Sequence, residues 1–161
     1  MSTNALPNLL EAAATRFPAN IAVEESDGAG VSYSELSRLS DRVRDRLSRL
    51  GVRPGDRVGM CMRKSADAVA VLFGIMKAGA AYVPVDPTAP AARSAYIFQN
   101  CAVKVLVAEE SMRGGLQREF ELGGFDSRQG LRAPENPIGG RESGVAPHPG
   151  IFSIPQEAIL S

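Results

Sequence analysis

Three charged residues of this chain could perform chemistry, and each also has a structural interpretation. Lys77 could bind a phosphate, but it lies two residues before a glycine that can end a helix, where a cation is favourable. Glu35 could act as an acid, but Ser32 and Glu35 form the Ser-x-x-Glu pattern of a capping box. Asp86 could bind a metal ion, but it has no neighbouring carboxylate or histidine and precedes Pro87, which indicates a turn. We favour the structural interpretation for all three.

The aromatic and sulfur-containing candidates lead to the same conclusion. Cys61 and Cys101 lie in apolar segments without an adjacent base, which predicts small buried side chains and not nucleophiles. His148, the only histidine, lies among prolines and glycines that cannot hold a catalytic pair rigidly. Tyr33 could contact a ligand, but at the first position of a capped helix we expect it to pack on the sheet.

Two segments could bind anions. One is a set of arginines on a single predicted helix: Arg38, Arg42, Arg46 and Arg49. The interleaved Asp41 and Asp45 favour a solvated face of mixed charge instead. The other is Gly139–Gly144, which lacks the lysine and the repeated hydroxyls of a phosphate-binding loop. The sequence therefore assigns no catalytic, cofactor-binding or metal-binding residue.

Composition narrows the class of protein. The chain has 161 residues, of which 44% are hydrophobic and 22% charged, as in ordinary globular domains. Its formal net charge of zero gives no global attraction to nucleic acid or to an anionic membrane. We expect a cytoplasmic protein, because we find no secretory signal, no apolar run long enough to span a bilayer, and only two cysteines.

Apolar periodicity predicts the helices that position these residues. The first covers residues 6–17, and the second follows the capping box with an apolar face of Leu36, Leu39, Val43, Leu47 and Leu50. A third helix after Ser65 is apolar almost all round, which predicts an interior position, and its Gly74 predicts close packing against a neighbour. Pro90 is placed as an N1 residue, and a fourth helix, Ala91–Asn100, follows it.

Strands alternate with these helices. A short hairpin is predicted around Asp27-Gly28, and further strands are predicted at residues 58–62, 80–85 and 103–107. We interpret Ala80–Val85 as a strand covered on both faces. The strand–helix alternation from Asp56 to Ala108 predicts an α/β fold with a parallel sheet and flanking helices.

The sequence changes character near residue 111. Residues 112–161 hold nine of the 16 glycines and five of the 11 prolines, and their apolar residues define no face. Such a tract buries too little surface to offset its ordering entropy. We therefore predict two parts: residues 1–110, which fold, and residues 111–161, a largely disordered tail of unrelated origin.

Three strings carry a family resemblance over residues 6–110. Residues 76–87 read Met-Lys-Ala-Gly-Ala-Ala-Tyr-Val-Pro-Val-Asp-Pro, residues 31–36 read Val-Ser-Tyr-Ser-Glu-Leu, and residues 50–58 read Leu-Gly-Val-Arg-Pro-Gly-Asp-Arg-Val. In this order and spacing they resemble the adenylate-forming, AMP-binding ligases. That family holds the adenylation domains of nonribosomal peptide synthetases, which the wording favours, and the acyl-CoA synthetases.

The resemblance implies a parent reaction. In such ligases a carboxylate attacks the α-phosphate of ATP with Mg²⁺, and the acyl group then passes to a pantetheine thiol of a carrier protein or coenzyme A. The chain lacks a string like the family's Thr-Ser-Gly-Ser-Thr-Gly-x-Pro-Lys-Gly phosphate loop and the later catalytic lysine. We therefore expect a truncated N-terminal piece that is inactive alone and holds no cofactor. A non-catalytic interaction module and a piece of an acyl-CoA synthetase remain the alternatives.

Overall fold

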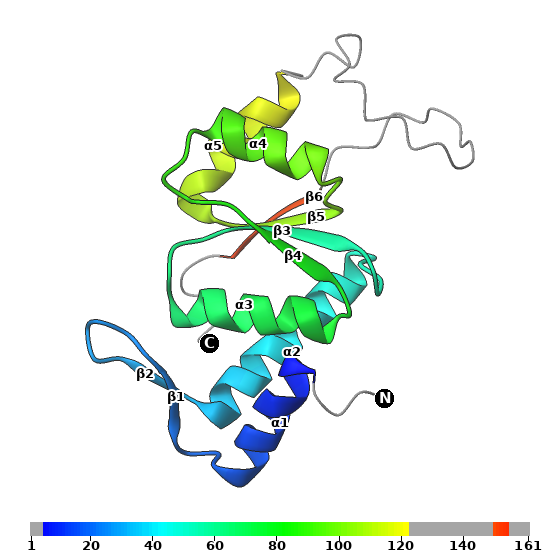
Figure 1. The fold of residues 1–161 in the computed structure, drawn as a ribbon. Coiled ribbons are helices and arrows are strands. Elements are labelled where there is room, and N and C mark those ends of the chain that lie inside the picture. Colours follow the sequence, from blue (N-terminus) through cyan, green and yellow to red (C-terminus); the bar gives the residue numbers. More distant parts are fainter. Residues whose placement is uncertain (1–4, 123–149, 155–161) are drawn as a thin grey trace.

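The computed structural model describes residues 5–122 and 150–154, which form an α/β fold (Figure 1). The helices are α1 (Leu6–Arg16), α2 (Tyr33–Arg49), α3 (Ala66–Lys77), α4 (Ala91–Asn100) and α5 (Glu110–Glu121). The strands are β1 (Ile21–Glu24), β2 (Gly30–Ser32), β3 (Arg57–Cys61), β4 (Ala81–Pro84), β5 (Val105–Glu109) and β6 (Gly150–Ile154). Strands β1 and β2 pair as an antiparallel hairpin, and the other four form a parallel sheet in the order β4-β3-β5-β6. The predicted parallel sheet is confirmed.

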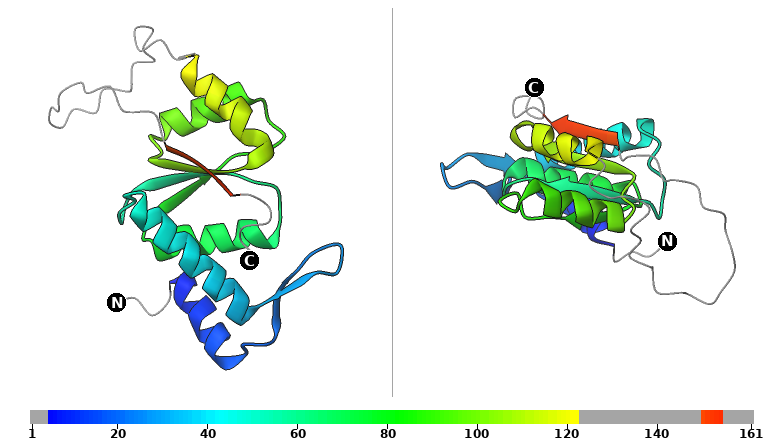
Figure 2. Two further views of the ribbon diagram at one scale, coloured as in Figure 1. Left: turned by 180° about the vertical axis from the view of Figure 1, so that it is seen from behind. Right: turned by 90° about the horizontal axis from the view of Figure 1, so that it is seen from above.

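Helices cover both faces of the sheet. Helices α4 and α5 lie on one face and α3 on the other, with α2 and then α1 beyond α3 (Figures 1 and 2). Alternate residues of β5 enter different apolar clusters: Val105 and Val107 pack towards α3, whereas Leu106 packs towards α4 and α5. Because successive side chains of a strand point to opposite faces of the sheet, β5 contributes residues to the apolar cluster on each face.

Helix α3 is sandwiched as its composition predicts. Ala70, Val71 and Ile75 are completely buried between the sheet and α2. A Cβ built on Gly74 would lie 2.5 Å from Val43 Cβ and 2.8 Å from the Ser40 carbonyl oxygen. Only glycine permits α3 and α2 to approach this closely, so the predicted close packing is confirmed.

The predicted helix ends are also present. Ser32 and Glu35 form both halves of the capping box, and Gly79 takes the left-handed conformation, φ 72°, just beyond α3. Pro90 occupies the N-cap of α4 and not its first helical position, a shift of one residue. Leu50 is exposed at the end of α2 and so does not extend its apolar face.

The prediction that residues 80–85 form a strand covered on both faces is wrong. Strand β4 lies at the edge of the sheet in the described part of the chain, and Tyr82 is 42% exposed. Pro84 agrees with an edge position, because a proline has no N–H to donate to a neighbouring strand. An apolar run shows that a strand is possible, but it does not fix how many neighbours the strand has.

The predicted disordered tail is wrong for two segments. Residues 110–121 form α5, whose Leu116 and Phe120 are buried one turn apart despite two glycines within the helix. Residues 150–154 form β6, which pairs in register with β5 from Val105↔Gly150 to Glu109↔Ile154. This pairing joins segments distant in sequence, so local composition could not reveal it. Residues 123–149 and 155–161 lie outside the described residues.

Among the described residues, none of the helices combines the length and apolar character that a bilayer crossing requires.

Gly74→Ala is expected to destabilise the fold by about 2 kcal/mol, because the new methyl group meets α2 backbone and a branched side chain. Gly114→Ala is the matched control, since its Cβ has nothing within 4 Å and α5 should gain about 0.5–1 kcal/mol. Urea unfolding of both variants measures the two changes. Equal effects of the same sign would contradict this packing.

Candidate functional site

The sheet topology places a crevice at the carboxyl ends of β3 and β5. These strands are neighbours, yet the helices that follow them, α3 and α5, lie on opposite faces of the sheet (Figure 1). Ligands of open α/β folds bind at such a point. A cavity of about 610 Å³ lies here, between the β1–β2 turn, the loop after β3 and the start of α5. Its charged lining residues are Glu25, Asp27, Arg63, Lys64, Asp67, Glu109 and Glu110.

Most charges of this crevice are already engaged by the protein. Glu109 accepts hydrogen bonds from the Arg63 backbone N (2.6 Å) and from Arg63 Nε (2.9 Å). Glu25 Oε1 accepts from the Ala66 N–H at the start of α3, at 2.7 Å. Burial raises the pKa of Asp67, and the Glu25 charge raises it further. Five carboxylates and two cations line the crevice, and this excess of negative charge disfavours an anionic ligand.

The described residues contain no group of three or more His, Cys, Asp or Glu side chains that could hold a metal ion. The glycine-rich segment Gly139–Gly144 and His148 lie outside the described residues, so their predicted roles stay predictions.

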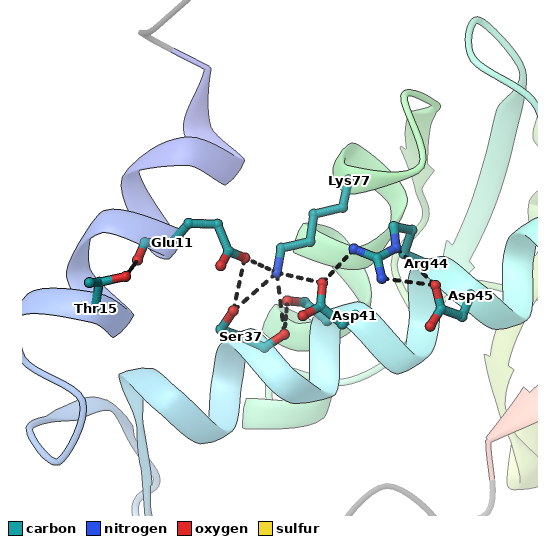
Figure 3. A network of polar contacts seen from close by, with 8 residues as sticks. Glu11, Thr15, Ser37, Asp41, Arg44, Asp45 and Lys77 are labelled. Atoms are coloured by element: carbon teal, nitrogen blue, oxygen red, sulfur yellow. Dashed lines mark hydrogen bonds and ion pairs between the residues drawn. The ribbon is translucent and has the colours of Figure 1, made fainter.

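Lys77, in the last turn of α3, lies at the centre of a network of polar contacts (Figure 3). Its side chain is only 6% exposed, and its ammonium group pairs with Asp41 Oδ1 at 3.0 Å and with the carboxylate of Glu11. It also donates to Ser37, whose carbonyl and hydroxyl oxygens both lie 3.2 Å away. The hydrogen bond from Lys77 is the main reason why the pKa of Glu11 lies below its ordinary value.

These contacts favour the structural interpretation of Lys77 over phosphate binding. Its three protons are shared among Glu11, Asp41 and Ser37, which leaves no donor for a ligand. Its predicted position at a helix end is confirmed, but its main role was missed. Lys77 joins α1, α2 and α3, and Glu11 and Ser37 gave no local signal because they lie far from it in sequence.

The other structural interpretations are confirmed. Glu35 Oε2 accepts from Ser32 N (2.9 Å) and Ser32 Oγ (2.7 Å), and the Ser32 backbone N–H is the main cause of its lowered pKa. Asp86 Oδ1 accepts from Thr88 N (2.8 Å) in a turn, which lowers the pKa of Asp86. Tyr33 packs against the apolar cluster between the sheet, α3 and α2.

The thiols behave as apolar side chains. Burial raises the pKa of Cys61 to about 11, so its reactive thiolate form is scarce at neutral pH. Cys101 is half-buried and packs against the cluster under α4 and α5.

The expected solvated face of mixed charge on α2 stays a prediction for Arg38, Arg42, Arg46 and Arg49. Asp41 and Asp45 both pair with Arg44, a residue that the sequence pattern did not single out.

Comparison with known proteins decides what this scaffold is part of. The family described as "AMP-binding enzyme" matches residues 10–134. The chain belongs to this family. The match to the AMP-binding enzymes covers most of the folded segment, from α1 through α5, and extends past residue 110.

Two relatives of this AMP-binding chain are synthetases by name. The AMB antimetabolite synthetase AmbB of Pseudomonas aeruginosa is 35% identical over 146 residues, which cover 86% of this chain. The phosphinothricin tripeptide synthetase PhsB of Streptomyces viridochromogenes is 38% identical over 104 residues, or 65% of this chain. The chain spans 11% and 9% of the lengths of these two relatives.

Solved structures agree on the fold. The AMPPNP-bound nonribosomal peptide synthetase FmoA3 is 34% identical, covers 67% of this chain and gives a TM-score of 0.63, with 12% of its own length matched. The anthranilate CoA ligase AuaEII in complex with anthranoyl-AMP is 25% identical and covers 71% of this chain. Its TM-score is 0.67, and 22% of its own length is matched. The N-terminal domain of FACL13 from Mycobacterium tuberculosis shares the fold over 96% of this chain, with a TM-score of 0.69 and 34% of its own length matched.

Lys77→Met is expected to destabilise the fold by about 1–3 kcal/mol, because it leaves the Glu11 carboxylate and Ser37 without their cation and leaves Asp41 with Arg44 alone. Lys104→Met, which removes an exposed ion pair with Asp56, should cost at most about 1 kcal/mol. Chemical unfolding at neutral pH compares the two variants. A larger loss in Lys104→Met would refute the central role of Lys77.

The pH dependence of the stability of Lys77→Met gives a second test. The lowered pKa of Glu11 means that its contribution is present above the unfolded value, about 4.3, and disappears as pH falls through the lower folded value. The stability gap between wild type and Lys77→Met should therefore narrow below about pH 4. A gap that widens on acidification would contradict this assignment.

Proposed function

We propose that this chain is the N-terminal scaffold of an amino-acid-activating adenylation domain. In the intact parent, ATP and Mg²⁺ would serve the adenylation of an amino acid or another carboxylic acid. The acyl group would then pass to the phosphopantetheine of a carrier protein. The observation that carries the proposal is the continuous family match over residues 10–134, together with relatives that are peptide synthetases.

The contacts of the described residues support a positioning role. The ionisable groups that the sequence singled out are used for capping, turns, packing and the Lys77 contacts. At the crevice beyond β3 and β5, Arg63 pairs with Glu109, and Glu25 accepts a hydrogen bond from the Ala66 N–H. We infer that residues 5–122 supply the frame on which ligand-binding segments of an intact ligase would be mounted.

A coenzyme A ligase is the second candidate for the parent. It is supported by the 25% identity to the anthranilate CoA ligase, which is lower than the 34% identity to the peptide synthetase structure. A cytoplasmic location and the division of the chain at residue 110 stay predictions from the sequence.

The 161-residue chain alone is expected to give no ATP–pyrophosphate exchange above background with a panel of amino acids and aryl or fatty acids. Its side chains at the crevice offer no phosphate cradle in the described residues. An intact adenylation domain serves as the positive control. Exchange that is saturable in one acid would overturn the scaffold proposal.

A chimera tests the scaffold directly. Residues 6–109 of this chain replace the equivalent segment in an intact peptide-synthetase adenylation domain and, separately, in a CoA ligase. We expect the first host to keep its own substrate and at least about a tenth of its kcat/KM, because the segment shapes the frame and not the pocket. Better retention in the second host would favour the CoA ligase, and loss in both with normal folding would support the non-catalytic module.

A further inference from the structure

The turn of the β1–β2 hairpin forms one wall of the crevice. Residues 24–30, which we call the flap, contribute Glu25, Asp27 and Gly30 to the lining of the cavity of about 610 Å³. The other walls are the loop after β3 and the start of α5. The hairpin projects from the helices as a separate arm (Figures 1 and 2). A movement of the flap would therefore change access to the crevice.

The flap is held together by its own hydrogen bonds. The Glu25 backbone N–H donates to the Ala29 carbonyl at 2.8 Å, and the Gly28 N–H donates to the Glu25 carbonyl at 2.9 Å. The Asp27 carboxylate accepts from the Ala29 N–H at 2.9 Å, and Gly28 takes the left-handed conformation, φ 86°. These contacts lie within the turn and do not involve the rest of the molecule, so the flap can move as one body.

The base of the hairpin is anchored, but it contains a place to bend. Val23 and Val31 pack against the apolar cluster around α3, which anchors the base. The strand pairing shifts its register between Ile21 and Val23, and such a bulge bends the strand that contains it. Every residue of β1 and β2 is half-buried or exposed, so bending at this point uncovers little apolar surface.

The side chain of Glu25 fastens the flap to α3. Its Oε1 accepts from the N–H of Ala66, the first residue of α3, at 2.7 Å. The positive end of the helix dipole favours a carboxylate at this position. Asp67, in the same turn, opposes it: burial raises the pKa of Asp67, and the Glu25 charge raises it further because like charges repel. Attraction and repulsion therefore act on Glu25 at the same helix end.

We propose that the flap opens and closes over the crevice, and that the Glu25–Ala66 hydrogen bond holds it closed. In the open state water solvates the carboxylate and the N–H, and the flap turns about the bulge as one body. A hydrogen bond to a charged group contributes only a modest net free energy, so thermal motion populates both states. The proposal does not depend on the adenylation function, because it concerns a motion of the chain itself.

Distances between two spin labels on the full chain test the motion. One label is attached at Ser26→Cys in the exposed flap and the other at Gly114→Cys in α5, where a Cβ has open space. Cys101→Ala in every sample leaves the buried Cys61 as the remaining native thiol. Pulsed electron paramagnetic resonance then gives the fraction of molecules with a longer distance across the crevice, which is the open fraction.

Three variants at the flap and one at α3 decide the outcome. Glu25→Ala should raise the open fraction at least about fivefold, and the matched control Glu24→Ala, at the exposed neighbouring residue, should stay within about twofold of wild type. Glu25→Gln keeps an oxygen acceptor and should lie between wild type and Glu25→Ala. Asp67→Asn removes the opposing charge and should not raise the open fraction. Equal open fractions in Glu25→Ala and Glu24→Ala, or in Glu25→Ala and Glu25→Gln, would overturn the proposal, as would a rise in Asp67→Asn.

Amide hydrogen exchange shows whether the flap moves as one body. In Glu25→Ala, the exchange rates of the Gly28 and Ala29 amides, followed by NMR, should stay within about threefold of wild type, because the turn keeps its own hydrogen bonds. Much faster exchange at these two amides would show that the turn unfolds instead of moving, and would overturn the proposal. Far-UV circular dichroism checks that each variant is folded.

Discussion

One buried ammonium group fixes the arrangement of the N-terminal half. Lys77 lies at the end of the helix that the sheet and α2 enclose, and its side chain is almost completely buried. A charge in that position is tolerable only with opposite charge and hydrogen-bond acceptors around it. Glu11 of α1 and Asp41 and Ser37 of α2 supply them. Leu10 is the only buried residue of α1. The polar contacts of Lys77 therefore help to hold α1 against α2 and α3, a role that an apolar interface would otherwise have.

The same junction determines the surface charge of α2. Asp41 pairs with both Lys77 and Arg44, and Asp45 also pairs with Arg44, so these carboxylates link the junction to the charges along α2. The other constraint on α2 is steric. Gly74 lets α3 lie directly against Val43, which also brings the end of α3 within reach of Asp41. Packing and electrostatics therefore depend on one another at this interface.

The chemistry of the crevice is limited by similar internal pairing. Arg63 holds Glu109 across the ends of β3 and β5, and Glu25 caps α3 from the hairpin. These contacts orient the loops that surround the topological switch point, where an intact α/β enzyme would place its ligand. The chain spans about a tenth of the length of two of its relatives, 11% and 9%.

The sequence by itself determined the local structure: the capping box at Ser32, the left-handed Gly79, the four helices of the first 100 residues and the alternation that gives a parallel sheet. It also determined the family, because the signature strings are contiguous. Only the tertiary structure decided that β4 lies at an edge, that residues 150–154 pair with β5, and that Lys77 meets Glu11. Backbone propensity, capping and periodicity act over a few residues and can be read locally. The partners of a strand edge or of a buried charge come from distant segments, and only folding brings them together.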